Sequence, residues 1–466
     1  MRQFPIAELD IAPGHLVQWR LRSTRAGHLG RPRRSASFNQ DKHFSAARQV
    51  RSAPDSLSSW VAATFEIPGQ LDRAALEAAM LGLVGRHEVL RCEFEQLMGD
   101  PAGDLTCAAL RPDEVALEPF EVGYLDSADE VRAYLADHFE KEIDTLSWPL
   151  LVMGAVVRAG SATVYFAFDH LVSDGLSVPV VVRDLATGYE AAVAGRTPEL
   201  PPTGSYVAFG HEQRRRYLAM RSDDERLGYW KSFMASAGGF FPHFPLDLGV
   251  APGRMYGTVN EGHRLLDARE AAAFEARCRG AGGSCFTGTL AAVGRALRDA
   301  GGPAVYRGLL PVSERGRGDL ENAMGWFVNT VPIEFPVPAG RPFGELLGEV
   351  RTAFRELLRH TDVPFVRAWQ LLAPEYAGLP CWPHPVNFFS YIDSRRVPGA
   401  EHHDRWHPTQ HVWASRCNGI SFWFHRDADG LHVNSIYADT PRAAAATATF
   451  WRALTRILAA LARGED

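Results

Sequence analysis

The chain is poor in lysine, in paired cysteines and in long apolar runs, and each shortage disfavours a class of protein. Only three of its 466 residues are lysine, and acidic side chains outnumber basic ones by 55 to 49, for a formal net charge of −6. A general nucleic-acid binder usually carries a basic excess or stripe, so no nucleic-acid partner is expected. The longest clean apolar runs are about eight residues, as in Leu150–Val157, whereas a membrane-spanning helix needs about twenty. No transmembrane segment is therefore expected.

The cysteines are sparse and unpaired in sequence. Six are present, with no C-x-x-C pair among them: Cys92, Cys107, Cys278, Cys285, Cys381 and Cys417. Neither a disulfide framework nor a zinc site is expected, and reduced thiols fit a cytoplasmic protein. The opening MRQFPIAELDIAPG also lacks the apolar core of a signal peptide. We therefore expect a cytoplasmic location.

A histidine-rich segment offers the one pattern that suggests a metal. His403, His407 and His411 follow one another at i, i+4 spacing, with His402 beside them. Pro408 argues against a continuous helix that would align them, and no H-E-x-x-H motif is present. A polar loop near a cleft is the favoured interpretation, and no metal is predicted.

The chain has the composition of an ordinary globular protein, with 46% hydrophobic and 22% charged residues. At about 150 residues per domain, its length predicts two to four domains. The first fifty residues are rich in Arg, Gly and Ser, which indicates loop with short structured pieces. Beyond them, strand and helix patterns alternate on both sides of a Pro- and Gly-rich linker at 195–204. This predicts two α/β layers, with domains at 1–200 and 201–466.

The periodicities place the expected elements. In the first half, strands are expected at 58–67, 88–94, 150–157 and 162–168, and helices at 72–85, 127–143 and 180–194. Ser127 and Glu130 form a capping-box pattern at the start of the second of these helices. In the second half, helices are expected at 211–235, 287–297, 343–358 and 441–462, and strands at 305–310, 386–392, 420–424 and 431–437.

The strongest local signal for chemistry is FDHLVSDG, from Phe168 to Gly175. His170 follows an apolar strand almost at once, so its side chain would project from the strand end into a cleft. Asp174 and Gly175 come next, and glycine permits a tight turn there. An imidazole titrates near neutral pH and is suited to act as a general base. A histidine that ends the strand for structural reasons stays open as the alternative.

Residues 169–175 (DHLVSDG) resemble the HHxxxDG motif of the condensation-domain superfamily, which includes chloramphenicol acetyltransferase and the condensation domains of nonribosomal peptide synthetases. Five further segments agree in the same order: RHEVLR at 86–91, PVSER at 311–315, GWFVNT at 325–330, VNFFSYID at 386–393 and GLHVNSIYADT at 430–440. Four segments further resemble polyketide-associated acyltransferases of actinobacteria: GHLVQWRL at 14–21, SFNQDKHF at 37–44, GWFVNTVPI at 325–333 and SYIDSRRVPG at 390–399. This resemblance covers residues 14–463. The resemblance implies two chloramphenicol acetyltransferase-like α/β subdomains that form a V-shaped pseudo-dimer with a central channel.

The resemblance also implies roles for motif residues. His170 matches the second motif histidine, which deprotonates the acceptor or steers the tetrahedral intermediate. Asp174 belongs to the same catalytic motif but is usually structural, and Arg315 matches its partner. A buried carboxylate without such a partner would be costly. Gly175 keeps space open for the arm that carries the acyl donor.

Three further positions of these segments have more than one possible role. Trp326 and Asn329 match positions near the cleft, and the side chain of Asn329 is a candidate oxyanion donor, as are backbone N–H groups near Gly175. Asp169 stands where the motif has its first histidine. Asp169 could orient a neighbouring group or simply cap the strand.

The resemblance implies an acyltransferase. It would move an acyl group from a thioester, on coenzyme A or an acyl carrier protein, to a hydroxyl or amine of a specialised metabolite or lipid. It would need no metal or redox cofactor and act as a monomer. A free-standing, amide-forming condensation enzyme of nonribosomal peptide synthesis is one alternative, and a non-catalytic carrier-docking module is another. The basic run Arg214–Arg216 is interpreted as a solvated helix surface, with a contact to an acidic carrier protein as the alternative.

Overall fold

The computed structural model describes residues 1–24, 31–50, 59–96, 105–237, 242–251, 254–316, 318–374 and 386–466. The chain divides into two compact units. The first contains Met1–Leu218, Ser313–Phe327 and Arg395–Ala414, and the second contains Ala219–Val312, Val328–Ser394 and Ser415–Asp466. This division differs from a single boundary at residue 200, because two segments from the second half of the chain make their contacts within the first unit.

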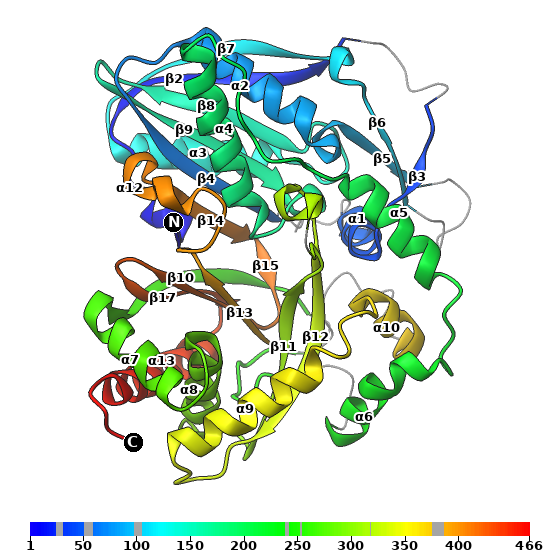
Figure 1. The fold of residues 1–466 in the computed structure, drawn as a ribbon, viewed down its shortest axis with the longest axis vertical. Helices are drawn as coiled ribbons and strands as arrows, with labels where there is room; N and C mark the ends of the chain where they lie inside the picture. Colours follow the sequence, from blue (N-terminus) through cyan, green and yellow to red (C-terminus); the bar gives the residue numbers. More distant parts are fainter. Residues whose placement is uncertain are drawn as a thin grey trace. The chain divides into compact units, whose positions relative to one another are not determined.

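The first unit is built on a seven-stranded sheet (Figure 1). Its strands, in spatial order, are β1 (Arg2–Phe4), β14 (Thr409–Ala414), β4 (Ser59–Pro68), β9 (Ser161–Asp169), β8 (Leu151–Val157), β2 (Gly14–Ser23) and β7 (Val115–Leu125). All neighbours are antiparallel except β1 and β14. The predicted strands at 150–157 and 162–168 are β8 and β9, whose apolar runs suit the centre of a sheet buried on both faces.

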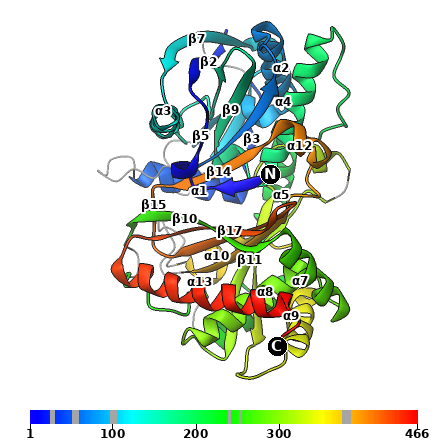
Figure 2. The ribbon, with the colours of Figure 1, turned by 90° about the vertical axis from the view of Figure 1, so that its left-hand side faces the viewer.

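Helices cover both faces of this sheet. The helices α2 (Arg73–Arg86) and α4 (Ser177–Val193) pack side by side on one face, and α3 (Ala128–Glu142) lies on the other (Figure 2). Alternate residues of the strands divide between two hydrophobic cores accordingly. Phe166 and Phe168 of β9 belong to the core under α2 and α4, whereas Tyr165 and Ala167 belong to the core under α3. Residue 169 continues the second set and is directed to the α3 side.

Local signals explain where these helices begin. The Asp72 side chain accepts from Ala75 N–H at the start of α2, and Ser127 accepts from Glu130 N–H at the start of α3. The capping-box position predicted for α3 is therefore its N-cap, and the Glu130 carboxylate accepts from Asp126 N–H at 2.7 Å. Residues 88–94, predicted as a strand, are instead the 3-10 turn η2 (Glu88–Arg91) followed by β5 (Cys92–Gln96).

The N-terminal fifty residues contain a helix that their composition did not predict. α1 runs from Phe38 to Val50. It begins with a reciprocal pair of hydrogen bonds, in which Ser37 N–H donates to Gln40 Oε1 and Gln40 N–H donates to Ser37 Oγ. A small sheet of β3 (Arg34–Ser35), β6 (Leu105–Ala109) and β5 lies in the same unit. Its remaining short elements are η1 (Ile6–Glu8), η3 (Pro112–Glu114), η4 (His170–Val172), η6 (Asp319–Asn322), η7 (Ala400–His402) and α12 (His403–Trp406).

The second unit repeats the α/β plan. Its seven-stranded sheet has the order β12 (Val328–Pro336), β11 (Val305–Ser313), β13 (Asn387–Asp393), β16 (Ile420–Asp427), β17 (Gly430–Ala438), β10 (Tyr256–Asp267) and β15 (Arg416–Cys417). The helices α7 (Ala268–Gly280), α8 (Cys285–Asp299), α9 (Phe343–Leu357) and α13 (Pro441–Ala462) pack on it, as Figures 1 and 2 show. α13 has the predicted bounds, because Thr440 caps it and Pro441 occupies its first turn.

One predicted helix is wrong. Residues 211–235 are not continuous: α5 (Tyr206–Tyr217) ends before the turn η5 (Glu225–Leu227), and α6 (Gly228–Ala237) follows. The second unit also contains the short helix α10 (Phe365–Leu372). Among the helices that the structure describes, none is long and apolar enough to cross a membrane.

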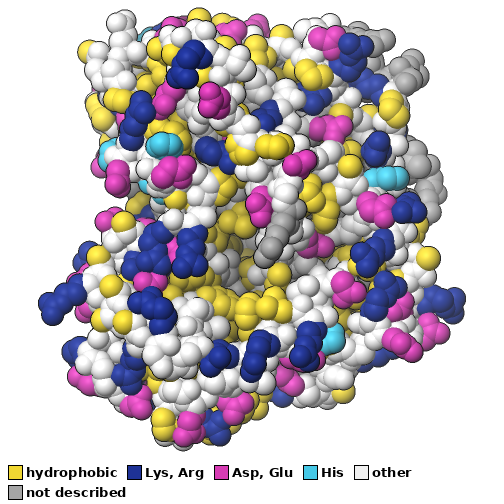
Figure 3. All heavy atoms as spheres, viewed as in Figure 1, with side chains coloured by type: hydrophobic (Ala, Val, Ile, Leu, Met, Phe, Trp, Pro, Cys, Tyr) yellow, Lys and Arg dark blue, Asp and Glu magenta, His cyan; other side chains and the backbone are white. Residues whose placement is uncertain are grey.

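The surface carries charges of both signs, and Figure 3 shows them interspersed on the face it displays. The basic run on α5 is not a uniformly solvated patch. Arg214 is buried, lies over the Phe38 ring and pairs with Asp41 at 3.1 Å. Arg215 pairs with Glu212 on its own helix. Part of this run therefore fixes α5 against α1.

Candidate active site

The end of β9 places the motif residues Asp169 and His170 in different environments. Asp169 is the last residue of the strand, opposite Trp60 of β4, and its N–H donates to Leu150 O at 3.0 Å. Its carboxylate then caps η4 by accepting from Leu171 N–H at 2.6 Å. His170 is the first residue beyond the sheet, so its side chain is set by the turn rather than by the strand.

His170 is partly buried against an aromatic ring. The centroid of the Trp326 ring lies 4.0 Å from that of His170, at an interplanar angle of 42°. Nδ1 of His170 is buried and has no hydrogen-bond partner among the described residues. Because Nδ1 is buried, Nε2 is the ring nitrogen that an incoming group could reach.

The surroundings of His170 favour its neutral form. Burial lowers the pKa of His170, and the neighbouring charge of His43 lowers it further, while Asp174 and Asp169 act in the opposite direction. The net shift is downward, so the imidazole is neutral at neutral pH. A neutral imidazole has the lone pair that a general base requires.

Asp174 forms the expected ion pair with Arg315. Arg315 Nη1 donates to one carboxylate oxygen at 2.7 Å and Nη2 to the other at 2.8 Å. Both side chains are buried, at 1% exposure for Asp174 and 6% for Arg315. This is the bidentate geometry in which a guanidinium matches a carboxylate best.

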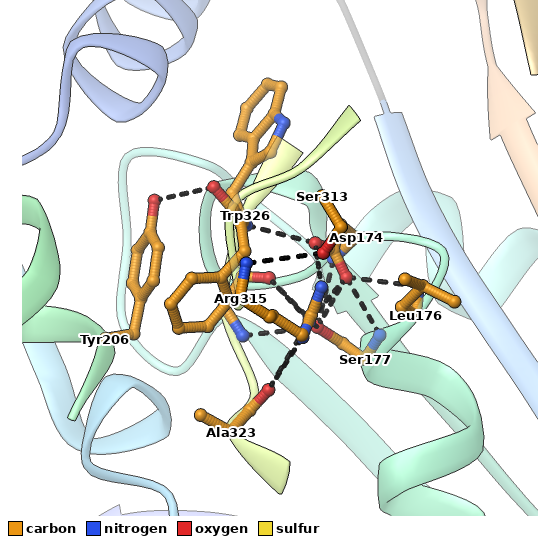
Figure 4. Close-up of polar contacts among 10 residues, drawn as sticks. Asp174, Leu176, Ser177, Tyr206, Ser313, Arg315, Ala323 and Trp326 are labelled. Atoms are coloured by element: carbon orange, nitrogen blue, oxygen red, sulfur yellow. Dashed lines mark hydrogen bonds and ion pairs between the residues drawn. The ribbon is translucent and has the colours of Figure 1, made fainter. Parts of the chain in front are cut away.

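Backbone and hydroxyl groups complete a cage around Asp174 (Figure 4). Oδ1 also accepts from Ser177 Oγ at 2.9 Å and from the N–H groups of Ser177 and Leu176, and Oδ2 accepts from Phe327 N–H at 3.0 Å. With this many donors on one carboxylate, Asp174 is suited to hold the motif turn in shape. Gly175 lies in this turn, between Asp174 and the start of α4.

Gly325 belongs to the same cage. Its N–H donates to Ser177 Oγ at 3.1 Å, and its carbonyl oxygen lies 3.0 Å from the same hydroxyl oxygen. Its φ is +155°, and a Cβ there would lie 2.3 Å from the ring of Tyr206. The glycine that opens the GWFVNT segment is therefore required by close packing, and it leads directly to Trp326 beside His170.

Asp169 binds an imidazole that sequence patterns did not identify. His43 Nε2 lies 3.1 Å from Asp169 Oδ1, and Thr145 Oγ1 donates to Asp169 Oδ2 at 2.6 Å. Burial alone would raise the pKa of Asp169, but His43, Thr145 and Leu171 N–H outweigh it and hold the pKa below its ordinary value. His43 lies on α1, a helix missed in a segment that had been interpreted as loop. The signal that could have found the helix is the capping-box spacing of Ser37 and Gln40 at its start.

Asn329 does not provide the oxyanion donor considered for it. Its Nδ2 donates to Thr361 O at 2.9 Å and to Val363 O at 2.8 Å, which uses both amide hydrogens. Its Oδ1 accepts from the N–H groups of Thr330 and Phe365. Asn329 lies in the second unit and fastens the segment that leads into α10.

The RHEVLR segment at 86–91 is structural as well. His87 Nε2 and Arg86 Nε lie 3.0 and 2.7 Å from the same carboxylate oxygen of Asp184, on α4. Arg91 Nε donates to Val84 O at 2.9 Å. These contacts fasten α2 to α4, the helix that follows the motif turn.

The histidines of 402–411 fall in separate elements. His403 Nδ1 lies 2.9 Å from the N-terminal amine, and His411 is in β14, where its Nδ1 lies 3.1 Å from Phe4 O. In the described part of the chain, no group of three or more His, Cys, Asp or Glu side chains is arranged to hold a metal ion.

Comparison with known proteins gives one family and one fold. Residues 50–377 match the condensation domain. Among proteins of Mycobacterium tuberculosis, 2'-acyl-2-O-sulfo-trehalose (hydroxy)phthioceranyltransferase PapA1 is 29% identical over 374 residues, which cover 78% of this chain and 70% of the relative. Trehalose-2-sulfate acyltransferase PapA2 is 26% identical over 462 residues, covering 97% and 95%.

Solved structures agree with this fold. A PapA2 acyl transferase structure superposes with a TM-score of 0.87 at 24% identity and covers 99% of this chain and 100% of that one. The first condensation domain of the calcium-dependent antibiotic synthetase has a TM-score of 0.70 at 16% identity, covering 92% and 96%. The prediction of two α/β subdomains of this fold is confirmed. His43 lies outside the residues matched to the family, which begin at residue 50.

Proposed function

The chain belongs to the condensation-domain family and is an acyltransferase, and from this premise we propose that it forms an ester between a thioester-borne acyl group and a hydroxyl, with His170 as the general base. The observation that carries the proposal is the imidazole of His170, which packs on Trp326 and is only partly buried. Because its Nδ1 is buried, Nε2 is the ring nitrogen left to meet an acceptor. A base kept neutral in such a place is ready to take a proton from an incoming nucleophile.

The proposed reaction has one addition and one elimination. The acceptor hydroxyl gives its proton to the imidazole as its oxygen attacks the thioester carbonyl. The C–S bond then breaks, and the departing thiolate takes the proton from the imidazolium. A positioned base of this kind contributes about 10²- to 10⁴-fold to the rate. The chemistry needs no acyl-enzyme. In this proposal the cage around Asp174 holds the turn that carries His170.

A sugar or related polyol is the proposed acceptor. Both mycobacterial relatives named above act, by their names, on sulfated trehalose. The donor in this proposal is an acyl chain on coenzyme A or on the phosphopantetheine of a carrier protein. An amine acceptor would make the chain an amide-forming condensation enzyme, the second candidate, which is favoured by the likeness to the antibiotic synthetase domain.

The test is acyl transfer by the purified chain. Acyl-CoA and acylated carrier protein are each incubated with trehalose, trehalose 2-sulfate, other polyols and amino acids, and the products are identified by mass spectrometry. We expect an ester with a sugar and a fall in kcat of about 10²- to 10⁴-fold in His170→Gln. The matched control is His15→Gln, because His15 is an exposed histidine paired with a carboxylate, Glu121. Amide products, or a His170→Gln variant as fast as the control, would contradict the proposal.

A further inference from the structure

The proposed function gives roles to His170 and Asp174 of the DHLVSDG segment. It gives none to Asp169, whose carboxylate pairs with His43. At the position of the first motif histidine, this chain has a carboxylate that is 2% exposed. That carboxylate is bonded by His43 Nε2, Thr145 Oγ1 and Leu171 N–H. A buried anion is tolerated only with such partners, and one of the three is an imidazole.

The geometry brings this imidazole to the catalytic base. The ring centroid of His43 lies 6.3 Å from that of His170. The His43 ring also meets Trp326 edge-on, at 5.5 Å and 78°, and Trp326 in turn packs on His170 at 4.0 Å. The three rings therefore form one cluster, with the indole in contact with both histidines.

The helix that carries His43 is tied to the motif turn. Gln40, one turn before His43 on α1, donates from Nε2 to Leu171 O at 2.9 Å. The same Gln40 side chain closes the capping pair with Ser37 at the start of α1. The position of His43 is thus fixed from both sides, by its own helix through Gln40 and by the strand end through Asp169.

We infer that His43 is a positioning residue for acyl transfer. Anchored by Asp169 and Thr145, it supplies from α1 the second imidazole that the HHxxxDG motif has at position 169, and it orients His170 through Trp326. This inference rests on the proposed role of His170 as the base. The inference also explains why the first motif histidine can be replaced by Asp169. The carboxylate of Asp169 binds the imidazole of His43, which takes the place of the missing one.

The charges around His170 determine the sign of the effect. His43 faces it from α1, Asp169 from the end of β9, and Asp174 from the motif turn, where Arg315 neutralises it. The electrostatic influence of His43 opposes a positive charge on His170. After burial, it is the largest influence that lowers the pKa of His170. Removing the His43 imidazole is therefore expected to raise the pKa of His170.

The experiment measures kcat/KM against pH for the full chain and its variants. In His43→Gln, which keeps a hydrogen-bond donor toward Asp169, the acid limb of the profile moves to higher pH, and kcat falls by about 10- to 100-fold with little change in KM. His43→Lys restores a positive charge and returns the limb toward lower pH. His15→Gln leaves both quantities as in the wild type. An acid limb that stays in place in His43→Gln overturns the inference.

A second readout does not depend on finding the substrate. The protein is labelled with ¹³C at histidine Cε1, the His170 resonance is assigned by its loss in His170→Gln, and its titration is followed. The inference predicts a higher midpoint for His170 in His43→Gln than in the wild type or in His15→Gln, and an unchanged midpoint overturns it. If no variant and no wild-type sample transfers an acyl group, the proposed function fails, while this titration still decides whether His43 controls His170.

Discussion

Two buried carboxylates of one motif, Asp174 and Asp169, lie five residues apart. The first is bound by an arginine and the second by a histidine. Asp174 is bound by the two nitrogens of a guanidinium that stays charged at any ordinary pH. Asp169 is bound by an imidazole, that of His43, at 3.1 Å. The same kind of side chain therefore holds a turn in one place and a histidine beside His170 in the other.

The difference extends to what surrounds each pair. The Asp174 cage uses main-chain groups of Leu176, Ser177 and Phe327, so its loss would disturb the backbone. Asp169 is bound by the side chains of His43 and Thr145 and by a single main-chain group, Leu171 N–H. His43 is 19% exposed and lies beside Trp326. Substitutions that break the Asp174–Arg315 pair should therefore lower the free energy of unfolding. Substitutions that break the Asp169–His43 pair should mainly change the rate and pH dependence of acyl transfer.

The largest expected effect is on the first pair. Arg315→Ala leaves the Asp174 carboxylate buried without its counter-charge, and removal of one partner from a buried ion pair typically costs about 3–5 kcal/mol. Unfolding in urea, followed by circular dichroism, measures the loss. Arg215→Ala, which removes a solvent-exposed arginine paired within α5, should unfold like the wild type. A loss in Arg315→Ala as small as in this control would show that the cage does not depend on the ion pair.

A smaller loss of stability is expected when Gly325, whose backbone belongs to the same cage, is replaced. Gly325→Ala drives a methyl group into the ring of Tyr206 at a φ of +155°, which should cost about 1–3 kcal/mol. Gly82→Ala is the matched control, because Gly82 lies within α2 with open space at its Cβ, and alanine favours the helix there. Equal unfolding midpoints for the two variants would contradict the close packing of Gly325 on Tyr206.

The smallest effect on stability is expected at Asp169, and it depends on pH. The folded-state pKa of Asp169 is depressed, so the carboxylate stabilises the fold above the unfolded value of about 4 and stops doing so as the pH falls through the folded value. The difference in unfolding free energy between the wild type and Asp169→Asn should therefore be full at neutral pH and shrink in acid. Urea titrations at several pH values measure it. A difference that grows in acid would have the wrong sign.

The sequence predicts those parts of the fold that local signals determine. The cap at Thr440 and the proline after it place α13, and the apolar runs before His170 place β8 and β9. Contacts between distant segments decide the rest. The strand β14, from residues 409–414, pairs with β4 in the first unit, and no pattern near residue 409 indicates this partner.

In the site, too, the sequence predicts the residues of recognisable motifs and misses those that only folding brings near. The motif identified His170, Asp174 and Arg315, because the ion pair joins two recognisable segments. His43 was missed because its helix lies in an Arg-, Gly- and Ser-rich segment with a weak apolar pattern, and because only the folded chain brings it to Asp169. Asn329 was placed near the chemistry, yet its amide is used within the second unit.

The central claim is that His170 takes the acceptor proton, and single-turnover acyl transfer measured from about pH 5 to about pH 9 tests it most directly. With saturating thioester and acceptor, the wild-type rate should rise with pH through one ionisation and then level. His170→Gln should be slower by about 10²- to 10⁴-fold and should lose that rise. A His170→Gln variant that keeps both the rate and the pH dependence of the wild type would contradict the account.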